Sequence, residues 1–394
     1  MTIELAARTR RIKPSPTLAV TARAAELRAQ GQDVLSLAAG EPDFDTPEHI
    51  KAAAIAALKA GRTKYTPVAG TPSLRKAIAA KHKRDNGLKF EINQICASTG
   101  GKQACYNLCQ AILNDGDEVV IPAPYWVSYP AMAALAGATP VAIETDAAAH
   151  YKVTPAQLEA AITPRTKLLF LNSPSNPSGM VYTRAELAAL GEVLLRHPQV
   201  VIATDDMYEK ILWAAEPFSN IINACPELAS RTVVIYAVSK TYAMTGWRLG
   251  WACGPKDIIA AMSKIQSQST SNPNSIAQAA AEAALNGDQS CVGTMVTAFK
   301  KRHDFVVAGL NDIPGVHCVS GDGTFYAFPN VSGLIKHLGV KDDVELATRL
   351  LDDALVALVP GTAFGTPNHV RLSFATSDKV LTEALARIRK LATA

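Results

Sequence analysis

The segment YAVSKTYAMTGWRLGW, residues 236–251, holds a lone lysine followed by a lone arginine. Lys240 follows an apolar run, and Arg248 lies eight positions later between Gly246 and Gly250. A lysine behind a buried strand is partly desolvated, and desolvation lowers the pKa of its amine towards that of a usable nucleophile. An arginine offers a fixed pair of donors suited to phosphate. The segment therefore combines a candidate nucleophile with a candidate phosphate ligand.

Two glycines in STGGKQACYNLCQAIL indicate a second place for phosphate. Gly100 and Gly101 follow a predicted strand that ends at Ser98 and Thr99, and they open a helix. Backbone amides at a helix start attract phosphate, although a plain strand-to-helix turn explains the same pattern. A Walker loop is disfavoured, because Cys96 stands where that motif requires glycine.

Two more polar segments follow apolar runs. VVIATDDMYEK places Asp205, Asp206 and Tyr208 at a strand end, and FLNSPSNPSG places Asn176 between a strand and a helix. Adjacent aspartates on a strand point to opposite sides, so we expect one to be buried and the other outside. A buried aspartate needs a cationic partner to stay charged. Taken alone, the acids are explained as a cap or surface charge, and the Asn176 segment as turn chemistry.

The elements that must position these residues form an α/β pattern. The chain has 394 residues, of which 48% are hydrophobic, enough for two domains with buried cores. Apolar runs at 118–122, 167–172, 200–206 and 232–239 alternate with segments of helical spacing. This order predicts a parallel sheet wrapped by helices, and ligands of such sheets bind beyond the carboxyl ends of the strands.

Helix signals and a change of pattern divide the chain. We expect helices capped by Thr46, Thr154 and Thr183, the first with Pro47 in its first turn and a stop at Gly61. After about residue 285 a long helix is followed by strands around GTFYAF and HVRLSFAT. We therefore predict a large domain at 46–285 and a smaller α/β domain formed by 1–45 with 286–394.

Charge and cysteine patterns exclude several classes of function. The 39 basic and 35 acidic residues are mixed along the chain, so nucleic acid is not an expected partner. No apolar run resembles a signal peptide or a membrane span, and we expect a cytoplasmic protein. Seven cysteines without a C-x-x-C pair and eight histidines without H-E-x-x-H argue against a metal site, and Cys105 and Cys109 are expected to be buried small hydrophobes.

A lysine amine, a phosphate seat, a buried aspartate and Asn/Tyr donors together fit one ligand, pyridoxal 5'-phosphate (PLP) bound as a Schiff base on Lys240. The motifs SKTYAMTGWRLGW, NSPSNPSG, TDDMYEK, STGGKQ, PYWVSYP, LAAGEPDFDTP, RTKYTPVAGTPSLRKAI and HVRLSFAT together resemble those of class I PLP-dependent aminotransferases of fold type I. The chain is most similar to bacterial aspartate aminotransferases with GGK in the phosphate loop. The resemblance covers the chain in collinear order, and it implies a large domain with a mostly parallel seven-stranded sheet beside a smaller α/β domain.

The resemblance implies a role for each residue near the reacting atoms. Lys240 would form the Schiff base and later move a proton at the substrate Cα as general base and acid. Asp205 would pair with the pyridinium nitrogen, while Asp206 would face elsewhere. Tyr208 and Asn176 would hydrogen-bond the phenolate oxygen of the cofactor.

The same resemblance assigns the rest of the cofactor site. The phosphate would be held by Arg248 and by the backbone amides of Gly100, Gly101 and Lys102. Trp126 would stack on the ring and border the substrate, although an aromatic residue behind a strand is more often part of the core.

Four residues are assigned to the substrate or to a partner subunit. Arg371 resembles the clamp for the substrate α-carboxylate, with Gly40 and Asn176 beside it. Gly40 and Arg371 come from the predicted small domain, so we expect that domain to close on substrate. Tyr65 resembles a residue that reaches the phosphate of the neighbouring subunit, which implies a homodimer with shared active sites, although a buried loop tyrosine is the plain alternative.

The implied reaction is ping-pong transfer of the amino group of L-aspartate to 2-oxoglutarate, giving oxaloacetate and L-glutamate. SKIQSQSTSNPNSIAQ lacks the arginine that binds the distal carboxylate in another subgroup, so Lys102 is the candidate, with a solvated or phosphate-adjacent charge as the alternative. Aromatic, alanine and prephenate aminotransferases and C–S lyases share most of these motifs. A PLP-binding transcriptional regulator is also disfavoured, because we expect no room for a DNA-binding domain before Gly40. A non-catalytic binding protein is disfavoured, because Lys240, Asp205 and Arg371 are all present.

Overall fold

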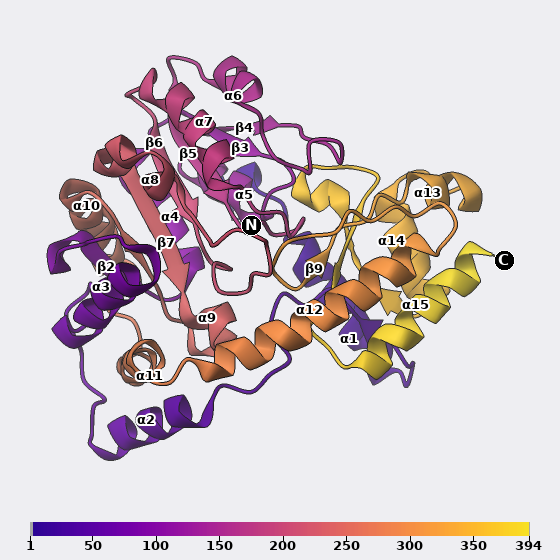
Figure 1. Cartoon of the computed structure of the whole chain (residues 1–394), viewed down its shortest axis with the longest axis horizontal. Helices are drawn as coiled ribbons and strands as arrows, with labels where there is room; N and C mark the ends of the chain where they lie inside the picture. The colour runs from indigo at the N-terminus through magenta and orange to yellow at the C-terminus, as the bar shows by residue number, and fades with distance from the viewer. Residues whose placement is uncertain (1–2, 394) are drawn as a thin grey trace.

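A computed structural model describes residues 3–393 and shows a seven-stranded mixed sheet between helices (Figure 1). The strand order is β2-β8-β7-β6-β5-β3-β4. The two strand pairs that include β8 are antiparallel, and the other pairs in the sheet are parallel. The strands are β2 (Ile95–Ser98), β3 (Glu118–Pro122), β4 (Thr139–Ile143), β5 (Thr166–Asn172), β6 (Val201–Asp205), β7 (Thr232–Ala237) and β8 (Gly250–Cys253). The predicted mostly parallel seven-stranded sheet is confirmed.

The central strands are apolar along their whole length because helices cover both faces of the sheet. In β7, Val234 and Tyr236 belong to one core cluster, whereas Val233 and Ile235 belong to another on the opposite face. Every residue of β7 is buried. A strand that is buried on both faces gives a continuous apolar run rather than an alternating one, which is why the sequence predicted these strands well.

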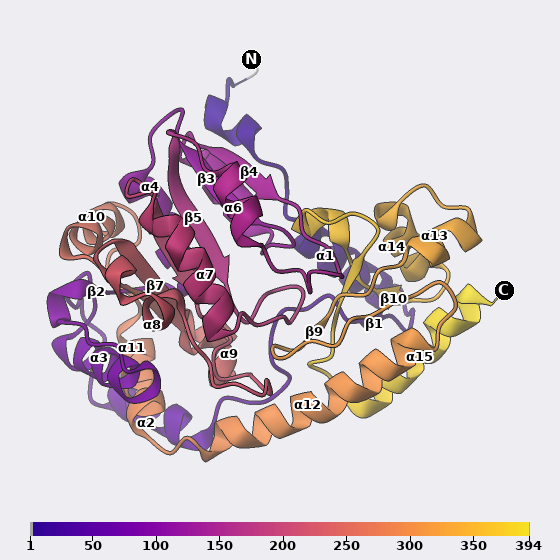
Figure 2. The same cartoon turned by 45° about the horizontal axis from the view of Figure 1, so that its top comes forward.

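The helices on the two faces come from different parts of the chain (Figures 1 and 2). One face packs against α2 (Glu48–Lys59), α3 (Pro72–Asn86), α6 (Pro155–Ala161), α7 (Arg184–Leu195), α8 (Ile221–Ala224) and α11 (Ser275–Asn286). The other face packs against α4 (Gly101–Ile112), α5 (Ser128–Leu135) and α10 (Lys256–Ser267). Cys105 and Cys109 of α4 are buried free thiols in this second core, as expected.

Two of the three predicted helix caps are confirmed. Thr154 and Thr183 each form a capping box at the start of α6 and α7. The prediction for Thr46 is wrong, because α2 begins at Glu48 after an extended Pro47. The Thr46 hydroxyl instead donates to the Ala243 carbonyl at 2.7 Å and accepts from Trp247 Nε1 at 2.9 Å. It therefore ties the start of α2 to the segment that follows Lys240.

The C-terminal third forms a second packed region with the N-terminal segment. It contains α12 (Ser290–Asn311), α13 (Ser332–Leu338), α14 (Asp343–Asp352), α15 (Asp378–Ala392), β9 (Tyr326–Ala327), β11 (Val359–Pro360) and β12 (Val370–Ser373). Near the N-terminus, α1 (Pro16–Ala29) precedes β1 (Leu35–Ser36), which pairs in parallel with β10 (Val356–Ala357). The remaining short elements are α9 (Val238–Thr241) and the 3-10 helices η1 (Ala7–Arg11), η2 (Ile92–Gln94), η3 (Pro226–Arg231), η4 (Thr245–Trp247) and η5 (Gly361–Phe364).

The predicted domain boundaries, at residues 45 and 285, stay a prediction. Tyr208 and Ile211, which lie inside the predicted large domain, pack in the same core cluster as Phe299 and Phe325 of the C-terminal region. Within residues 3–393, no helix has both the length and the apolar character that a bilayer crossing requires.

Candidate active site

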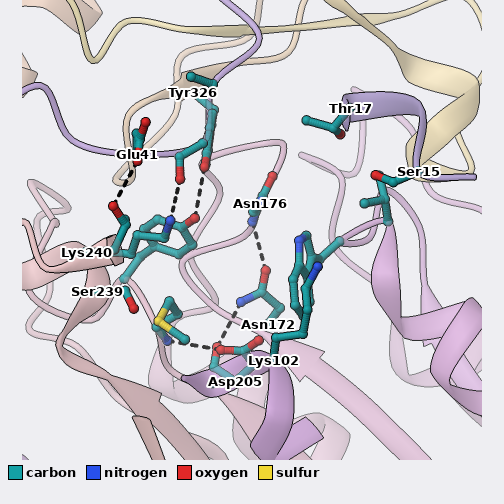
Figure 3. Close-up of a pocket in the computed structure, with 18 of the residues that line it drawn as sticks. Ser15, Thr17, Glu41, Lys102, Asn172, Asn176, Asp205, Ser239, Lys240 and Tyr326 are labelled. Atoms are coloured by element: carbon teal, nitrogen blue, oxygen red, sulfur yellow. Dashed lines mark hydrogen bonds between the residues drawn. The ribbon is translucent and has the colours of Figure 1, made fainter. Parts of the chain in front are cut away.

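A cavity of about 410 Å³ opens where the central strands end (Figure 3). Asn172 and Asp205 are the last residues of β5 and β6, and Lys240 follows β7 by three residues. The predicted site residues that line this cavity are Gly40, Gly101, Lys102, Trp126, Asn176, Asp205, Tyr208, Lys240, Arg248 and Arg371. The structure thus brings together residues that are up to 331 positions apart in the chain, as the distance from Gly40 to Arg371 shows.

Lys240 lies in the one-turn helix α9, and its amine reaches the backbone carbonyl of Gly40. Burial, followed by the positive charge of Arg371, lowers the pKa of Lys240 to about 8. Among residues 3–393, no carboxylate lies within ion-pair distance of this amine. Lys240 is therefore a basic group with an appreciable uncharged fraction near neutral pH, as a proton acceptor or a nucleophile requires.

Asp205 is a buried carboxylate held by neutral donors. Its Oδ2 accepts a hydrogen bond of 2.5 Å from the Tyr129 hydroxyl, and its Oδ1 accepts one of 3.3 Å from the Met207 amide. Burial raises the pKa of Asp205 to about 6, against the opposing effects of these hydrogen bonds and of Lys240. A cationic group placed in the cavity beside Asp205 would keep the carboxylate ionised.

The expectation that Asp205 or Asp206 lies outside the protein is wrong, because both are buried. The two side chains do leave the strand end in different directions: Asp205 lines the cavity and Asp206 does not. Asp206 accepts hydrogen bonds from Thr204 Oγ1 at 2.6 Å and Asn220 Nδ2 at 3.0 Å. These local donors satisfy a second buried acid, which strand alternation alone did not predict.

Arg371 on β12 is a buried cation without an anionic partner in the described chain. Its Nη1 donates to Asn176 Oδ1 at 3.0 Å and its Nη2 donates to the Ala38 carbonyl at 2.8 Å, while Nε has no hydrogen-bond partner. The guanidinium carbon lies 4.4 Å from the ring centroid of Tyr326. Burial lowers the pKa of Arg371 below its usual value. An unpaired buried charge is costly, so this arrangement favours binding of a carboxylate.

Gly40 permits a close approach of three segments. A Cβ at this position would lie 2.9 Å from the Tyr326 hydroxyl and 4.0 Å from Arg371 Nη2. The Tyr326 hydroxyl is also 3.0 Å from the hydroxyl of Tyr208. Any side chain at Gly40 would therefore displace the aromatic pair next to Arg371.

A second cationic region lies at the start of α4. Gly100 caps this helix with a left-handed backbone (φ +85°), and a Cβ there would lie 2.6 Å from Arg248 Nη2. Arg248 is exposed, has φ +54°, and donates from Nη1 to the Thr245 carbonyl at 2.8 Å. An arginine across a helix N-terminus forms a seat for a phosphate group.

Lys102 extends this cationic region towards Trp126. The Lys102 ammonium lies 5.0 Å from the centroid of the Trp126 ring. Partial desolvation, followed by the charge of Arg248, lowers the pKa of Lys102. The ring and both cations therefore border the same part of the cavity.

Two predicted site residues do not line the cavity. Gly100 lies against Arg248, where the absence of a side chain leaves room for the guanidinium group. Tyr65 is 93% exposed in the single chain. The alternative of a buried loop tyrosine is therefore wrong for the isolated chain, and the contact with a partner subunit stays a prediction.

Several cavity residues were missed at the sequence level. They are Ser15, Thr17, Leu18, Thr21, Ala39, Glu41, Val127, Tyr129, Asn172, Met207, Ser239, Thr245 and Tyr326. Asn172 had the same signal as Asp205, because it ends an apolar run. Its Nδ2 donates to the Asp205 carbonyl and its Oδ1 accepts from the Asn176 amide, both at 2.8 Å. By contrast, no local pattern marks Ser15, which precedes α1, or Thr17 in α1, and both face the cavity opposite Lys240 (Figure 3).

The residues around the cavity fit PLP. The phosphate seat at Gly100 and Arg248, the acid at Asp205 and the amine of Lys240 match the three polar parts of that cofactor, namely phosphate, ring nitrogen and aldehyde. The buried Arg371, with an unpartnered Nε, leaves a place for a carboxylate beside them.

Comparison with known proteins agrees with this geometry. Residues 32–388 match the family described as aminotransferase class I and II. The chain is 55% identical to an aspartate/prephenate aminotransferase of Nitrosomonas europaea, over 99% of this chain and 100% of the relative. It is 50% identical to an aspartate aminotransferase of Geobacillus stearothermophilus, over 98% of each chain. The crystal structure of an aspartate aminotransferase from Rhizobium meliloti superposes with a TM-score of 0.96 at 46% identity, covering 100% of this chain and 99% of that one.

Proposed function

The chain belongs to the class I and II aminotransferases, which are PLP-dependent, and on that premise we propose that it transfers the amino group of L-aspartate to 2-oxoglutarate. The products would be oxaloacetate and L-glutamate, formed in two half-reactions. One observation carries the proposal: a single cavity holds an amine of lowered pKa, Lys240, and an unpaired buried guanidinium, Arg371. The names of the relatives from Nitrosomonas and Geobacillus support aspartate as the amino donor.

Residues of the cavity would hold PLP through its three polar parts. Lys240 would form the Schiff base, and Asp205 would bind the ring nitrogen. Arg248, together with the backbone amides of Gly100, Gly101 and Lys102, would bind the phosphate, and Trp126 would stack on the ring. When bound, PLP accepts the electron pair of the bond that breaks at the substrate Cα.

The chain's own residues would then orient the substrate and move its proton. Arg371, with Asn176 and Gly40 beside it, would hold the α-carboxylate and so fix which bond at Cα is broken. Lys240 would remove the proton from the substrate Cα and deliver a proton to C4' of the cofactor. Its pKa of about 8 suits both accepting and donating a proton near neutral pH. Tyr208 and Asn176 would donate hydrogen bonds to the phenolate oxygen of the cofactor.

The distal carboxylate of aspartate would be bound by Lys102. This ammonium lines the cavity beside Trp126 and carries no ion pair in the described chain. A second candidate acceptor is prephenate, because the relatives that are 55% and 54% identical are both named aspartate/prephenate aminotransferases. Prephenate also carries a second carboxylate, which Lys102 could bind in the same way.

The enzyme would act as a homodimer with shared active sites. Tyr65, although 93% exposed in one chain, would reach the phosphate of the neighbouring subunit. The region that contains Arg371 would close over the bound substrate.

The decisive test is the visible absorption spectrum of the purified protein loaded with PLP. We expect a band from the lysine-bound cofactor that L-aspartate removes and 2-oxoglutarate restores. L-Phenylalanine should have a much weaker effect at equal concentration. Bleaching by phenylalanine alone would overturn aspartate as the substrate, and no band after reconstitution would overturn the cofactor assignment.

A further inference from the structure

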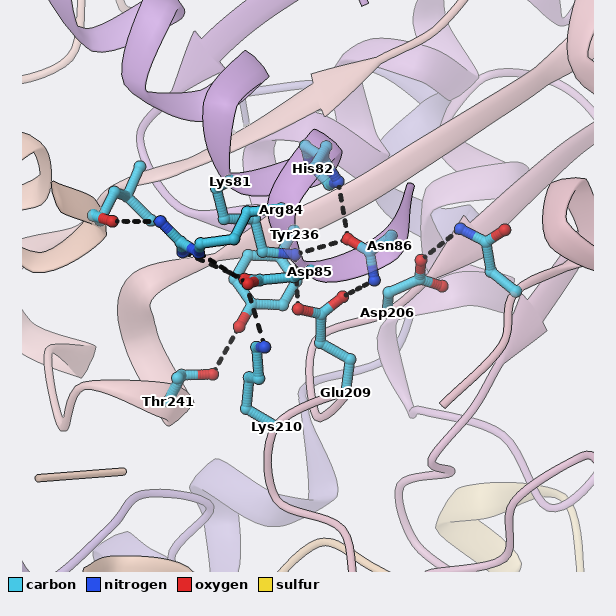
Figure 4. Close-up of polar contacts among 12 residues, drawn as sticks. Lys81, His82, Arg84, Asp85, Asn86, Asp206, Glu209, Lys210, Tyr236 and Thr241 are labelled. Carbon is cyan, nitrogen blue, oxygen red and sulfur yellow. Dashed lines mark hydrogen bonds and ion pairs between the residues drawn. The ribbon is translucent and has the colours of Figure 1, made fainter. Parts of the chain in front are cut away.

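A mostly buried polar cluster lies outside the cavity, and Figure 4 shows its polar contacts. We call it the back cluster, and it consists of Lys81, His82 and Asn86 of α3, Asp206 and Glu209 after β6, and Tyr236 and Thr241 around β7. None of these residues lines the main cavity. The reaction proposed above does not use them directly.

At the centre of the back cluster is an ion pair between Lys81 and Glu209. Both side chains are only 1% exposed. The Lys81 ammonium also donates to Asn86 Oδ1 at 3.0 Å, and Asn86 Nδ2 donates to Glu209 Oε2 at 2.9 Å. Three side chains therefore close a ring of one ion pair and two hydrogen bonds.

His82 fixes the orientation of Asn86 in this ring. Trp251 Nε1 lies 2.9 Å from His82 Nε2, and an indole nitrogen can only donate, so His82 Nε2 is the acceptor. The His82 proton is then on Nδ1, which donates to Asn86 Oδ1 at 3.2 Å. Burial lowers the pKa of His82 well below its usual value, which keeps the ring neutral. Asn86 Oδ1 thus receives two donors and leaves Nδ2 for Glu209.

Three residues of the site each have a back-cluster residue as their next neighbour in the chain. Glu209 follows Tyr208, Asp206 follows Asp205, and Thr241 follows Lys240. The hydroxyl of Thr241 is 2.6 Å from that of Tyr236, and the Lys81 ammonium lies 4.2 Å from the centroid of the Tyr236 ring. One lysine of α3 therefore contacts both the segment that carries Tyr208 and the strand that leads to Lys240.

Stability alone does not explain a buried lysine–glutamate pair. Desolvation of two charges costs as much as, or more than, their attraction returns, and apolar residues of similar volume are often equally stabilising. The two hydrogen bonds that close the ring around this ion pair add directionality, which favours a single geometry. We propose that the Lys81–Glu209 pair is a positioning element that holds Tyr208 and Lys240 at the distances the reaction needs, an inference that rests on the proposed transaminase function.

The test is the double variant Lys81→Met/Glu209→Gln, which removes both charges and keeps an acceptor for Asn86 Nδ2. We expect kcat for aspartate to fall at least about tenfold, with KM changed less than about threefold, since small misplacements of reacting groups mainly slow the chemical step. A pH titration of the absorption of the lysine-bound cofactor provides an independent readout. Its midpoint should rise, because a displaced Tyr208 donates a weaker hydrogen bond to the phenolate oxygen.

A matched control removes another ion pair from the same sheet. Glu118 at the start of β3 accepts from Arg165 Nε at 2.9 Å, and this end of the strand lies away from the cavity. Glu118→Gln/Arg165→Met should leave kcat and the titration midpoint unchanged. If the control and the back-cluster variant lower kcat equally, the pair has only a structural role and the inference is overturned.

Two further variants keep the inference testable if the double variant does not fold. Tyr236→Phe removes only the hydrogen bond to Thr241 and should lower kcat about threefold, with a smaller rise of the midpoint. In a Tyr208→Phe background the effect of the double variant on kcat should shrink, because the two changes act through the same group. Full additivity, or a Tyr236→Phe enzyme with unchanged kcat and midpoint, would overturn the inference. An unmodified enzyme that binds PLP without accepting aspartate would contradict the proposed substrate, and the absorption titration would still decide the positioning role.

Discussion

Lys240 and Lys81 both lie near the end of β7, but Lys240 lines the cavity and Lys81 does not. The Lys81 ammonium meets Glu209, Asn86 and the ring of Tyr236. The Lys240 amine meets the backbone carbonyl of Gly40. The charge of Lys81 is balanced within the chain by Glu209. The charges around Lys240 are not balanced by the described chain, and we expect a bound ligand to balance them.

The lining of the cavity as a whole also has an unbalanced charge. It contains four basic side chains, Lys102, Lys240, Arg248 and Arg371, but only two acidic ones, Glu41 and Asp205. The unbalanced positive charge suits ligands with a phosphate and carboxylates, as a PLP enzyme acting on a dicarboxylic amino acid needs. The comparison teaches that in this fold unpaired charge marks the ligand site, whereas paired buried charge marks its support.

The largest effect is expected from Lys240→Ala. If Lys240 is both the general base and the cofactor anchor, as proposed, turnover with aspartate and 2-oxoglutarate should fall by at least about 10⁴-fold. The protein should still fold, because Ala leaves no buried amine to desolvate. Steady-state kinetics and a thermal melt of the same sample measure both outcomes, and retained multiple turnover would refute the assignment of Lys240.

A smaller loss is expected from Arg371→Leu. If Arg371 binds the α-carboxylate as proposed, its loss should lower kcat/KM for aspartate about 10³-fold, equivalent to about 4 kcal/mol of transition-state binding. The free energy of unfolding of the cofactor-free protein should change by no more than about 1 kcal/mol, because removal of an unpaired buried charge offsets the lost bonds to Asn176 and Ala38.

The matched comparison for Arg371→Leu is Lys81→Met, which leaves Glu209 buried without its cation. Denaturant unfolding should show a loss of about 3–5 kcal/mol. If Arg371→Leu destabilises the protein as much as Lys81→Met does, Arg371 contributes to stability like a paired charge. That result would contradict the conclusion that Arg371 lacks a partner within the chain.

The features that could be predicted from the sequence are those marked by residues close together in the chain. Lys240 and Asp205 end apolar runs, and the strands themselves were predicted because they are buried on both faces. Thr154 and Thr183 cap helices through residues three positions away. Each of these inferences needed only neighbours in the chain.

The back cluster shows why the rest could not be predicted. Lys81 lies in the segment KHKRDN, where a basic residue is typical of a solvated helix face. Its partner Glu209 is 128 positions away, and only the packing of α3 against the ends of β6 and β7 brings them together. The same holds for Tyr129, whose bond to Asp205 joins α5 to β6. A single sequence shows which residue types are present, but not which distant residues the fold brings into contact.

The smallest effect, and the sharpest test of the cavity's charge, is expected from Lys102→Ala. If Lys102 binds the distal carboxylate, KM for aspartate should rise about tenfold, the equivalent of about 1.4 kcal/mol, while KM for phenylalanine changes little because that side chain carries no charge. Lys264→Ala is the matched control, since this exposed lysine of α10 does not line the cavity and should leave both constants unchanged. Equal increases for both substrates would assign Lys102 to the phosphate end of the cavity, and the distal carboxylate would then be bound by uncharged groups of the lining, such as the hydroxyls of Ser15, which precedes α1, and Thr17 in α1.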